Sequence, residues 1–291
     1  MFQGVFTALV TPFNEDRSVN KEELKKLIDF NIEKGVSGIV PMGTTGESPT
    51  LSHEEHIEII ETVCKYVDKR VPIIAGTGSN STKEALFMTT RAKELGADAS
   101  LQVAPYYNKP TQEGFYRHYK KIADEVDLPI IVYNIPGRSG KNIETDTIVR
   151  LSSHPNIIGV KEASGSLPQM MDVINGTPDD FVVLSGDDGL TLPLMAAGGK
   201  GVISVASNIV PDRMSAMVKA GLNEDFEKMR KLHYELLPLF KVEFIETNPI
   251  PIKTALAMKG MIKEIFRLPM CEMYPENKKK LRSVLEDLNI L

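Results

Sequence analysis

A lysine closes a short apolar run and is the residue in this chain best suited to covalent chemistry. Turn-forming residues bound the run from Ile157 to Lys161 on both sides, so it predicts a buried strand. Burial disfavours the ammonium form of lysine, and the free amine can attack a carbonyl to form a Schiff base. Gly159 lies on the same predicted strand face and is expected to leave room beside the amine. For a lysine considered alone, the alternative is an exposed residue at a strand end.

Further polar residues follow other apolar runs, where they could pass protons or hold a carboxylate. The phenol of Tyr133 is expected on the same side as the lysine and could serve it as an acid or base, although a buried tyrosine often only packs. Thr44 and Thr45 lie in a glycine-rich turn that offers hydroxyls and amides to a carboxylate, or is a plain turn. Arg138 is a candidate for binding a substrate carboxylate, against a surface ion pair as the alternative.

Two other pairs of residues are less specific. Tyr106 and Tyr107 form an aromatic pair in a predicted loop, which suits either catalysis or an interface anchor. Asp187 and Asp188 could suggest a metal site, but no histidine or third carboxylate accompanies them at ligand spacing. Helix capping is therefore the favoured role for this acidic pair.

Eight short apolar runs alternate with helical patterns and predict the strands that position these residues. Apolar strands separated by helices are typical of an α/β protein with a helix-covered parallel sheet, and eight such units close into a (β/α)₈ TIM barrel. The strand ends, and so the polar residues above, would then meet at one mouth. An open doubly wound sheet is the alternative, but the first run lacks a following dinucleotide-binding fingerprint. The runs are Val5–Val10, Val36–Val40, Val71–Ala75, Ala99–Val103, Ile130–Tyr133, Ile157–Lys161, Phe181–Leu184 and Val202–Ser204.

Capping patterns mark several ends of the intervening helices. The segments that begin at Ser52 and Ser81 each match a capping box, and Gly35 and Gly96 are expected to follow helix C-termini. After about residue 224 the strand pattern stops, and a catalytic barrel at residues 1–224 with a C-terminal helical region at residues 225–291 is expected. The helices predicted there are Glu224–Leu239, Ile250–Lys259 and Pro275–Leu288.

The composition of the 291 residues is that of a soluble globular protein, with 42% hydrophobic and 25% charged residues. The net charge of −5 argues against a protein that binds nucleic acid or a membrane surface, so small-molecule partners are expected. No apolar stretch approaches the roughly 20 residues of a spanning helix, and the start lacks a signal-peptide pattern, which predicts a cytoplasmic protein. Cys64 and Cys271 are far apart and are expected to be reduced thiols.

Taken together, the motifs resemble the dihydrodipicolinate synthases, also called 4-hydroxy-tetrahydrodipicolinate synthases, of the pyruvate-dependent class I aldolase superfamily. The resemblance extends over nearly the whole chain, as far as the segment 248–251. Many motifs in the right order are far more specific than any single one. Those that carry it are Gly43-Thr44-Thr45-Gly46-Glu47, Tyr106-Tyr107-Asn108-Lys109-Pro110, Tyr133-Asn134-Ile135-Pro136-Gly137-Arg138 and Gly159-Val160-Lys161-Glu162.

The resemblance implies a condensation of pyruvate with L-aspartate 4-semialdehyde in the diaminopimelate route of lysine biosynthesis. A Schiff base with pyruvate would lose a methyl proton to give an enamine that attacks the aldehyde. Because the protonated imine is itself the electron sink, no cofactor and no metal are expected. The implied roles are Schiff base for Lys161, proton donor and acceptor for Tyr133, hydroxyl relay for Thr44 and Tyr107, pyruvate carboxylate binding for Thr45, backbone contact with pyruvate for Ile203, and second-substrate carboxylate binding for Arg138.

The resemblance also implies partners. A homotetramer built from two tight dimers is expected, in which Tyr107 reaches into the neighbouring subunit's site. Feedback inhibition by L-lysine at a subunit interface is a further expectation, although polar residues in the first turns of two capped helices would give the same pattern. The positions that match such an effector site are Ser48, Pro49, His53, His56, Asn80, Glu84 and Tyr106.

Two other functions stay open at this stage. A sister aldolase, such as N-acetylneuraminate lyase or a 2-keto-3-deoxy sugar acid aldolase, would share the lysine and the tyrosine. Arg138 and the Tyr106-Tyr107 pair favour instead a small aldehyde that bears a carboxylate. A non-catalytic barrel that senses pyruvate-like metabolites is the second alternative, but binding alone requires neither a nucleophile nor a proton relay.

Overall fold

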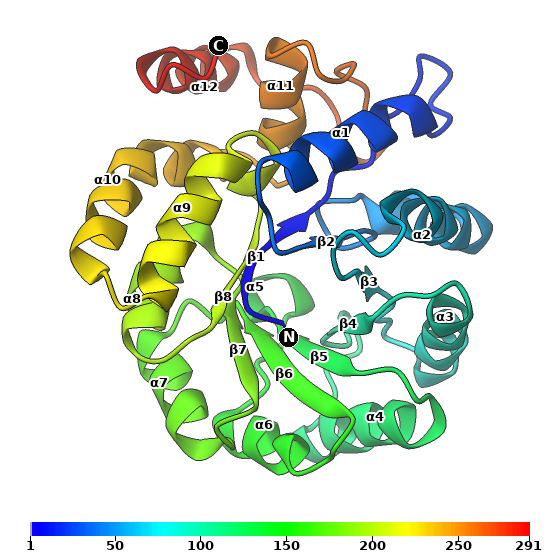
Figure 1. Ribbon diagram of the computed structural model, residues 1–291. Coiled ribbons are helices and arrows are strands. Elements are labelled where there is room, and N and C mark those ends of the chain that lie inside the picture. Colours follow the sequence, from blue (N-terminus) through cyan, green and yellow to red (C-terminus); the bar gives the residue numbers. More distant parts are fainter. Residues whose placement is uncertain (1) are drawn as a thin grey trace.

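Eight parallel strands form the centre of the structure, a computed structural model that describes residues 2–291 (Figure 1). Strand β1 pairs with both β2 and β8, and the order across the sheet is β2-β1-β8-β7-β6-β5-β4-β3. A single parallel bridge between Ile39 and Ile73 joins the two remaining edges, so the barrel is nearly closed. The strands are β1 (Gly4–Ala8), β2 (Gly38–Val40), β3 (Ile74–Gly76), β4 (Ala99–Val103), β5 (Ile130–Asn134), β6 (Ile157–Glu162), β7 (Val182–Ser185) and β8 (Gly201–Ser204).

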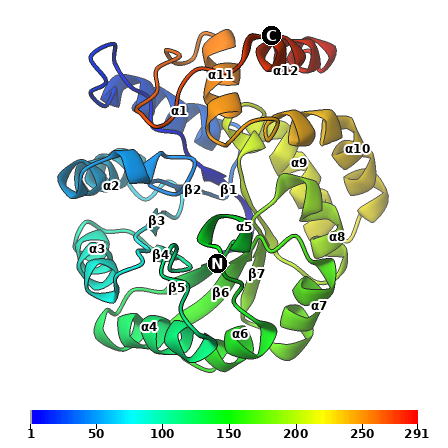
Figure 2. The same ribbon diagram turned by 180° about the vertical axis from the view of Figure 1, so that it is seen from behind.

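Helices surround the strands, as both views along the barrel show (Figures 1 and 2). The short α5 is an exception and lies close to the barrel axis rather than in the outer ring. Within residues 2–291, no helix is both long and apolar enough to cross a membrane. The barrel helices are α1 (Lys21–Glu33), α2 (His53–Val67), α3 (Thr82–Glu94), α4 (Gln112–Glu125), α5 (Pro136–Ser139), α6 (Thr145–Ser152), α7 (Leu167–Gly176), α8 (Thr191–Ala196) and α9 (Pro211–Leu222), with short 3-10 turns η1 (Ser48–Thr50), η2 (Asp188–Leu190) and η3 (Ala206–Asn208).

The eight predicted strands all form: β4 has the predicted bounds, and the ends of the others differ from the prediction by at most three residues. The capping box at Ser52 is confirmed, because its hydroxyl accepts from Glu55 N and the Glu55 carboxylate accepts from Ser52 N. The capping box predicted at Ser81 is wrong: its side chain makes no cap bond, and the Glu84 carboxylate contacts Ser79 and His53 instead. Gly35 and Gly96 follow their helices with φ of 86° and 92°, which confirms them as C-terminal glycines.

Two apolar layers fill the molecule, as alternation along the strands requires. One layer packs between the sheet and the surrounding helices. The other fills the barrel interior, where Phe6, Leu101, Ile131 and Ile203 gather around the axis. Tyr133 belongs to this inner layer, so its phenol points into the barrel and not toward the helices.

The C-terminal helical part consists of α10 (Phe226–Val242), α11 (Ile250–Met258) and α12 (Pro275–Asp287). Helix α10 packs on α9, and α12 packs on both α10 and α11 (Figure 1). Helix α11 is tied to the loop after β2 by a fully buried ion pair between Lys253 and Glu47, with Lys253 Nζ 4.2 Å from the centre of the Phe13 ring. The division of the chain at residue 224 stays a prediction.

Candidate active site

Lys161 and Tyr133 lie beside each other on neighbouring strands. The register of β5 and β6 pairs the two residues directly, and Lys161 Nζ lies 4.2 Å from the centre of the Tyr133 ring. Their exposed fractions are only 6% and 5%. The burial expected for Lys161 from its apolar run is therefore confirmed, and so is the placement of the phenol beside it.

Burial changes the acid–base properties of both groups. It lowers the pKa of Lys161 to about 7; the nearby Asp188 carboxylate opposes this shift and the Arg138 guanidinium adds to it. Burial raises the pKa of Tyr133 to about 12, an effect that Arg138 and a hydrogen bond with Thr44 partly offset. Near neutral pH a large fraction of Lys161 is thus the free amine, while the phenol keeps its proton.

The space beside Lys161 comes from a glycine other than the one predicted. A side chain at Gly159 would meet Val182 O at 2.4 Å, so Gly159 allows close approach of β6 and β7 and does not clear the lysine. A Cβ at Gly186 would lie 3.1 Å from Lys161 Cε. Gly186, directly after β7, is therefore the glycine that accommodates the lysine side chain, and the expectation for Gly159 is corrected.

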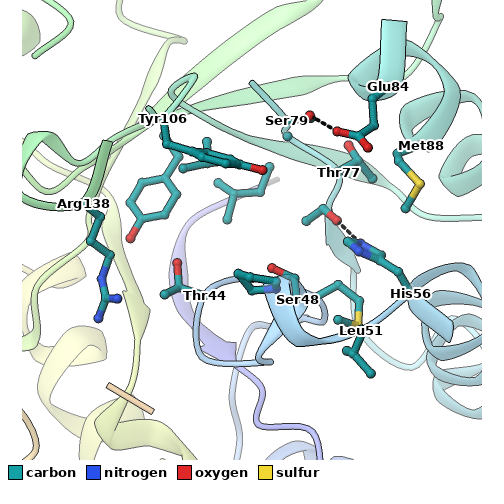
Figure 3. A pocket seen from close by; sticks show the side chains of 18 of the residues that line it. Thr44, Ser48, Leu51, His56, Thr77, Ser79, Glu84, Met88, Tyr106 and Arg138 are labelled. Atoms are coloured by element: carbon teal, nitrogen blue, oxygen red, sulfur yellow. Dashed lines mark hydrogen bonds between the residues drawn. The ribbon is translucent and has the colours of Figure 1, made fainter. Parts of the chain in front are cut away.

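A cavity of about 430 Å³ opens at this end of the barrel and has two ends (Figure 3). Thr44, Tyr133 and Arg138 line one end, from the loop after β2, from β5 and from α5. The other end is bounded by residues from η1, α2, α3 and the loop after β4. They include Ser48, Pro49, His53, His56, Glu84 and Tyr106.

Asn248 connects two of the predicted carboxylate-binding residues. Its side-chain Nδ2 donates to Thr45 Oγ1 at 3.0 Å, and its backbone carbonyl oxygen accepts from Arg138 Nη2 at 3.1 Å. The residue lies between α10 and α11, so the C-terminal helical part contributes to the barrel mouth. The sequence predicts no role for Asn248 beyond its place in the segment 248–251, which belongs to the family resemblance. Ile203 lies in the barrel interior on β8.

The two tyrosines after β4 diverge. Tyr106 lines the cavity, and its carbonyl oxygen accepts from Asn80 Nδ2 at 3.1 Å. Tyr107 is 90% exposed, adopts a left-handed backbone with φ of 71°, and does not line the cavity. Within one chain, then, the fold does not bring Tyr107 to Tyr133 and Thr44.

The residues matched to an effector site form a polar group at the second end of the cavity. His53 Nε2 lies 2.6 Å from Glu84 Oε1, and Glu84 also accepts from the Ser79 hydroxyl. His56 Nε2 donates to Gly76 O at 2.7 Å, and burial lowers the pKa of His56 to about 4. His56 is thus neutral at physiological pH, and Glu84 is the acidic residue of the group.

The two residues of the acidic pair after β7, Asp187 and Asp188, make different contacts. Asp187 Oδ1 accepts from Gly189 N at 2.8 Å, so the capping role expected for this residue is confirmed. Asp188 is 1% exposed, its Oδ2 accepts from Val205 N and Ala206 N where η3 begins, and its charge raises the pKa of Lys161.

The chain matches the model of the dihydrodipicolinate synthetase family over residues 1–288. A 4-hydroxy-tetrahydrodipicolinate synthase from Thermodesulfovibrio yellowstonii is 54% identical over 291 residues, which cover 100% of both chains. Among solved structures, the dihydrodipicolinate synthase from Acinetobacter baumannii complexed with pyruvate is 45% identical, with a TM-score of 0.98 over 100% of both chains. The lysine-bound enzyme from Cyanidioschyzon merolae is 40% identical, with a TM-score of 0.97 over 100% of this chain and 99% of that one.

These likenesses cover the full chain at high identity, so they bear on activity as well as on fold. They confirm the expected TIM barrel and the expected activity, that of a 4-hydroxy-tetrahydrodipicolinate synthase, a lyase of the class I aldolase type. The open doubly wound sheet is excluded by the observed strand order. The chain belongs to the dihydrodipicolinate synthetase family.

Proposed function

We propose that Lys161 is the Schiff-base nucleophile with which this chain condenses pyruvate and L-aspartate 4-semialdehyde. The observation that carries the proposal is a buried lysine, 6% exposed and with its pKa lowered to about 7 by burial, that lies against the ring of a protonated phenol. A neutral amine is needed for attack on a keto group, and a proton donor is needed for loss of water.

The reaction then follows from the chemistry of the imine. The Lys161 amine adds to the keto carbon of pyruvate, and loss of water leaves a protonated imine. Loss of a methyl proton gives an enamine, whose terminal carbon bonds to the aldehyde carbon of the semialdehyde. The aldehyde oxygen takes up a proton and becomes a hydroxyl group. The amino group of the semialdehyde finally displaces Lys161 from the imine carbon, which closes the ring and frees the enzyme.

Tyr133 is the group proposed to move protons in these steps. Its hydroxyl bonds with Thr44, which lines the cavity and so connects the phenol with the space open to substrate. Tyr107 would continue this relay from a neighbouring subunit, and its 90% exposure leaves the ring available for such a contact. The homotetramer built from two tight dimers is proposed from membership of the family, and an active monomer in equilibrium sedimentation would contradict it.

Carboxylate binding is proposed for Thr45, Ile203 and Arg138. Thr45 Oγ1 accepts the Asn248 amide, which leaves the threonine O–H free to donate to the pyruvate carboxylate. Ile203 would offer backbone groups at the end of β8. The exposed Arg138 lines the cavity mouth and would pair with the carboxylate of L-aspartate 4-semialdehyde.

The second end of the cavity is proposed as a site for L-lysine. The Glu84 carboxylate would hold an ammonium group, and the solved relative from Cyanidioschyzon merolae has lysine bound. Because the same cavity also contains Thr44 and Tyr133, an occupant here lies next to the relay. The polar contacts would come from His53, His56, Asn80, Glu84 and Tyr106. The expected cytoplasmic location stays a prediction.

Steady-state assays with alternative substrates test the proposed substrate pair. Pyruvate with L-aspartate 4-semialdehyde should give the highest kcat/KM. Faster cleavage of N-acetylneuraminate or 2-keto-3-deoxygluconate would assign the chain to a sister aldolase activity. A chain that binds pyruvate without turning over any of these substrates would be a sensor.

A further inference from the structure

We propose that Asp188 and Glu243 form a buried carboxyl pair that shares one proton, and that the single negative charge of this pair stabilises the cationic forms of Lys161. The inference rests on the Schiff base proposed above for that lysine. It assigns both carboxyl groups as positioning residues, one from the barrel and one from the C-terminal helical part.

Asp188 connects the segment that follows β7 with the segment that follows β8. It begins the 3-10 turn η2 after β7, and its Oδ2 accepts from Val205 N at 2.9 Å and from Ala206 N at 3.0 Å. Those two amides follow β8 directly. Asp188 Oδ2 therefore accepts from two backbone N–H groups that begin η3.

Glu243 brings a second carboxyl group to the same place. It follows α10, which packs against η2, and its exposed fraction is 1%. The Asp188 carboxyl group is close enough to raise the pKa of Glu243, both by its charge and by accepting a hydrogen bond from the protonated form. Neither Glu243 oxygen, nor Asp188 Oδ1, finds a donor among residues 2–291. Two carboxylates only accept hydrogen bonds, so the contact becomes a bond only if one of the groups carries a proton.

The surroundings place that proton on Glu243. No N–H group points at Glu243 within residues 2–291, whereas two point at Asp188. Burial, the charge of Asp188 and the nearby Asp187 raise the pKa of Glu243 well above its ordinary value. Glu243 is therefore a neutral acid that donates to Asp188, as in other buried pairs of carboxyl groups that hold one proton.

The negative charge of the carboxyl pair acts on the Lys161 side chain. Gly186, two residues before Asp188, packs directly on the Lys161 side chain, and the Asp188 carboxylate raises the pKa of Lys161 against the effect of burial. The other groups that face Lys161 are the Arg138 guanidinium, which lowers its pKa, and the neutral phenol of Tyr133. Among these groups, Asp188 is thus the one that favours an ammonium or a protonated imine over the neutral form.

The pH dependence of kcat/KM for pyruvate separates this role from a purely structural one. Glu243→Gln keeps a donor to Asp188 and keeps the charge of the pair. The acidic limb of its pH profile, the range in which kcat/KM rises with pH, should therefore coincide with that of the wild type. The double variant Asp188→Asn/Glu243→Gln keeps the shape of the pair and removes its charge. Its acidic limb should move to lower pH by roughly one unit, because one opposite charge next to a buried group shifts its pKa by about 1–3 units.

Two comparisons complete the test. The exposed Asp179→Asn in the loop before β7 removes one negative charge far from the pair, and its acidic limb should not move. Trapping with pyruvate and borohydride at Lys161 shows whether the Schiff base itself exists. If Lys161 is trapped but the double variant and Glu243→Gln have the same acidic limb, the role of the carboxyl pair is contradicted while the proposed function stands. If the wild type is not trapped at Lys161, the proposed function fails as well.

Discussion

Tyr133 and Lys161 occupy directly paired positions on β5 and β6, with the lysine Nζ 4.2 Å from the centre of the phenol ring. Parallel strands place side chains of paired residues on the same face, so this arrangement follows from the barrel register. The barrel interior removes both groups from water, which makes the amine a nucleophile and keeps the phenol protonated. One register pair therefore supplies both a nucleophile and an acid.

Removing a hydroxyl from the proposed relay should slow turnover without abolishing imine formation. Tyr133→Phe and Thr44→Val should each lower kcat by about 10²–10⁴-fold, the usual scale of acid–base assistance. The exposed Tyr234→Phe is the matched control and should behave as wild type. Steady-state kinetics with both substrates checks this prediction, and a wild-type rate in either variant would remove that residue from the relay.

The pH profile should report the free amine of Lys161. Because the neutral form attacks pyruvate and burial lowers the pKa to about 7, kcat/KM for pyruvate should rise up to that pH and then level off. The Arg138 guanidinium lowers this pKa, so Arg138→Ala should move the acidic limb to higher pH. Arg150→Ala, which removes an arginine paired with Glu113 on the surface, should leave the limb in place. A limb near the ordinary lysine pKa would contradict the buried, uncharged amine.

Stability should depend on pH through Glu243. Its pKa is raised in the folded state, so the folded protein holds a proton that the unfolded chain releases above the ordinary carboxyl pKa of about 4.5. The free energy of unfolding should therefore fall as pH rises from about 5 to 7. In Glu243→Gln this decline should be shallower by about 1.4 kcal/mol per pH unit, the effect of one proton. Urea unfolding at several pH values, at fixed protein concentration, measures both slopes, and equal slopes would mean that Glu243 is ionised in the folded protein.

L-Lysine should inhibit the enzyme through Glu84. We expect inhibition at millimolar concentrations or below in the coupled assay, and Glu84→Ala should abolish it because the ammonium group loses its opposite charge. Glu94→Ala, at the exposed end of the same helix, should remain sensitive. Absence of inhibition, or undiminished inhibition in Glu84→Ala, would exclude this end of the cavity as the effector site.

The sequence predicts the parts of the site that depend on local pattern. Short continuous apolar runs predict the two strands, and the alternation of side chains along a strand places Tyr133 and Lys161 on one face, and the structure agrees. A capping box is also a local pattern, but the one at Ser81 fails because Glu84 is held by His53 and Ser79. Local patterns are reliable only where no distant residue competes for the same side chain.

Other parts of the site depend on contacts between distant segments. Gly186 accommodates Lys161 from the neighbouring strand, and Asn248 reaches Thr45 across 203 positions of the chain. Glu243 meets Asp188 only because α10 packs against the turn after β7. No periodicity or spacing within one chain encodes such contacts, so they become visible only when the barrel and the C-terminal helices are assembled.

Reduction with borohydride in the presence of pyruvate tests the central claim most directly, because it converts an imine into a stable amine. Mass mapping of the digested protein should find one pyruvate-derived adduct, on the peptide that contains Lys161. The adduct should disappear in Lys161→Ala and persist in the control variant Lys200→Ala, which changes an exposed lysine. An adduct on another residue, or none in the wild type, would contradict the assignment of Lys161 as the nucleophile.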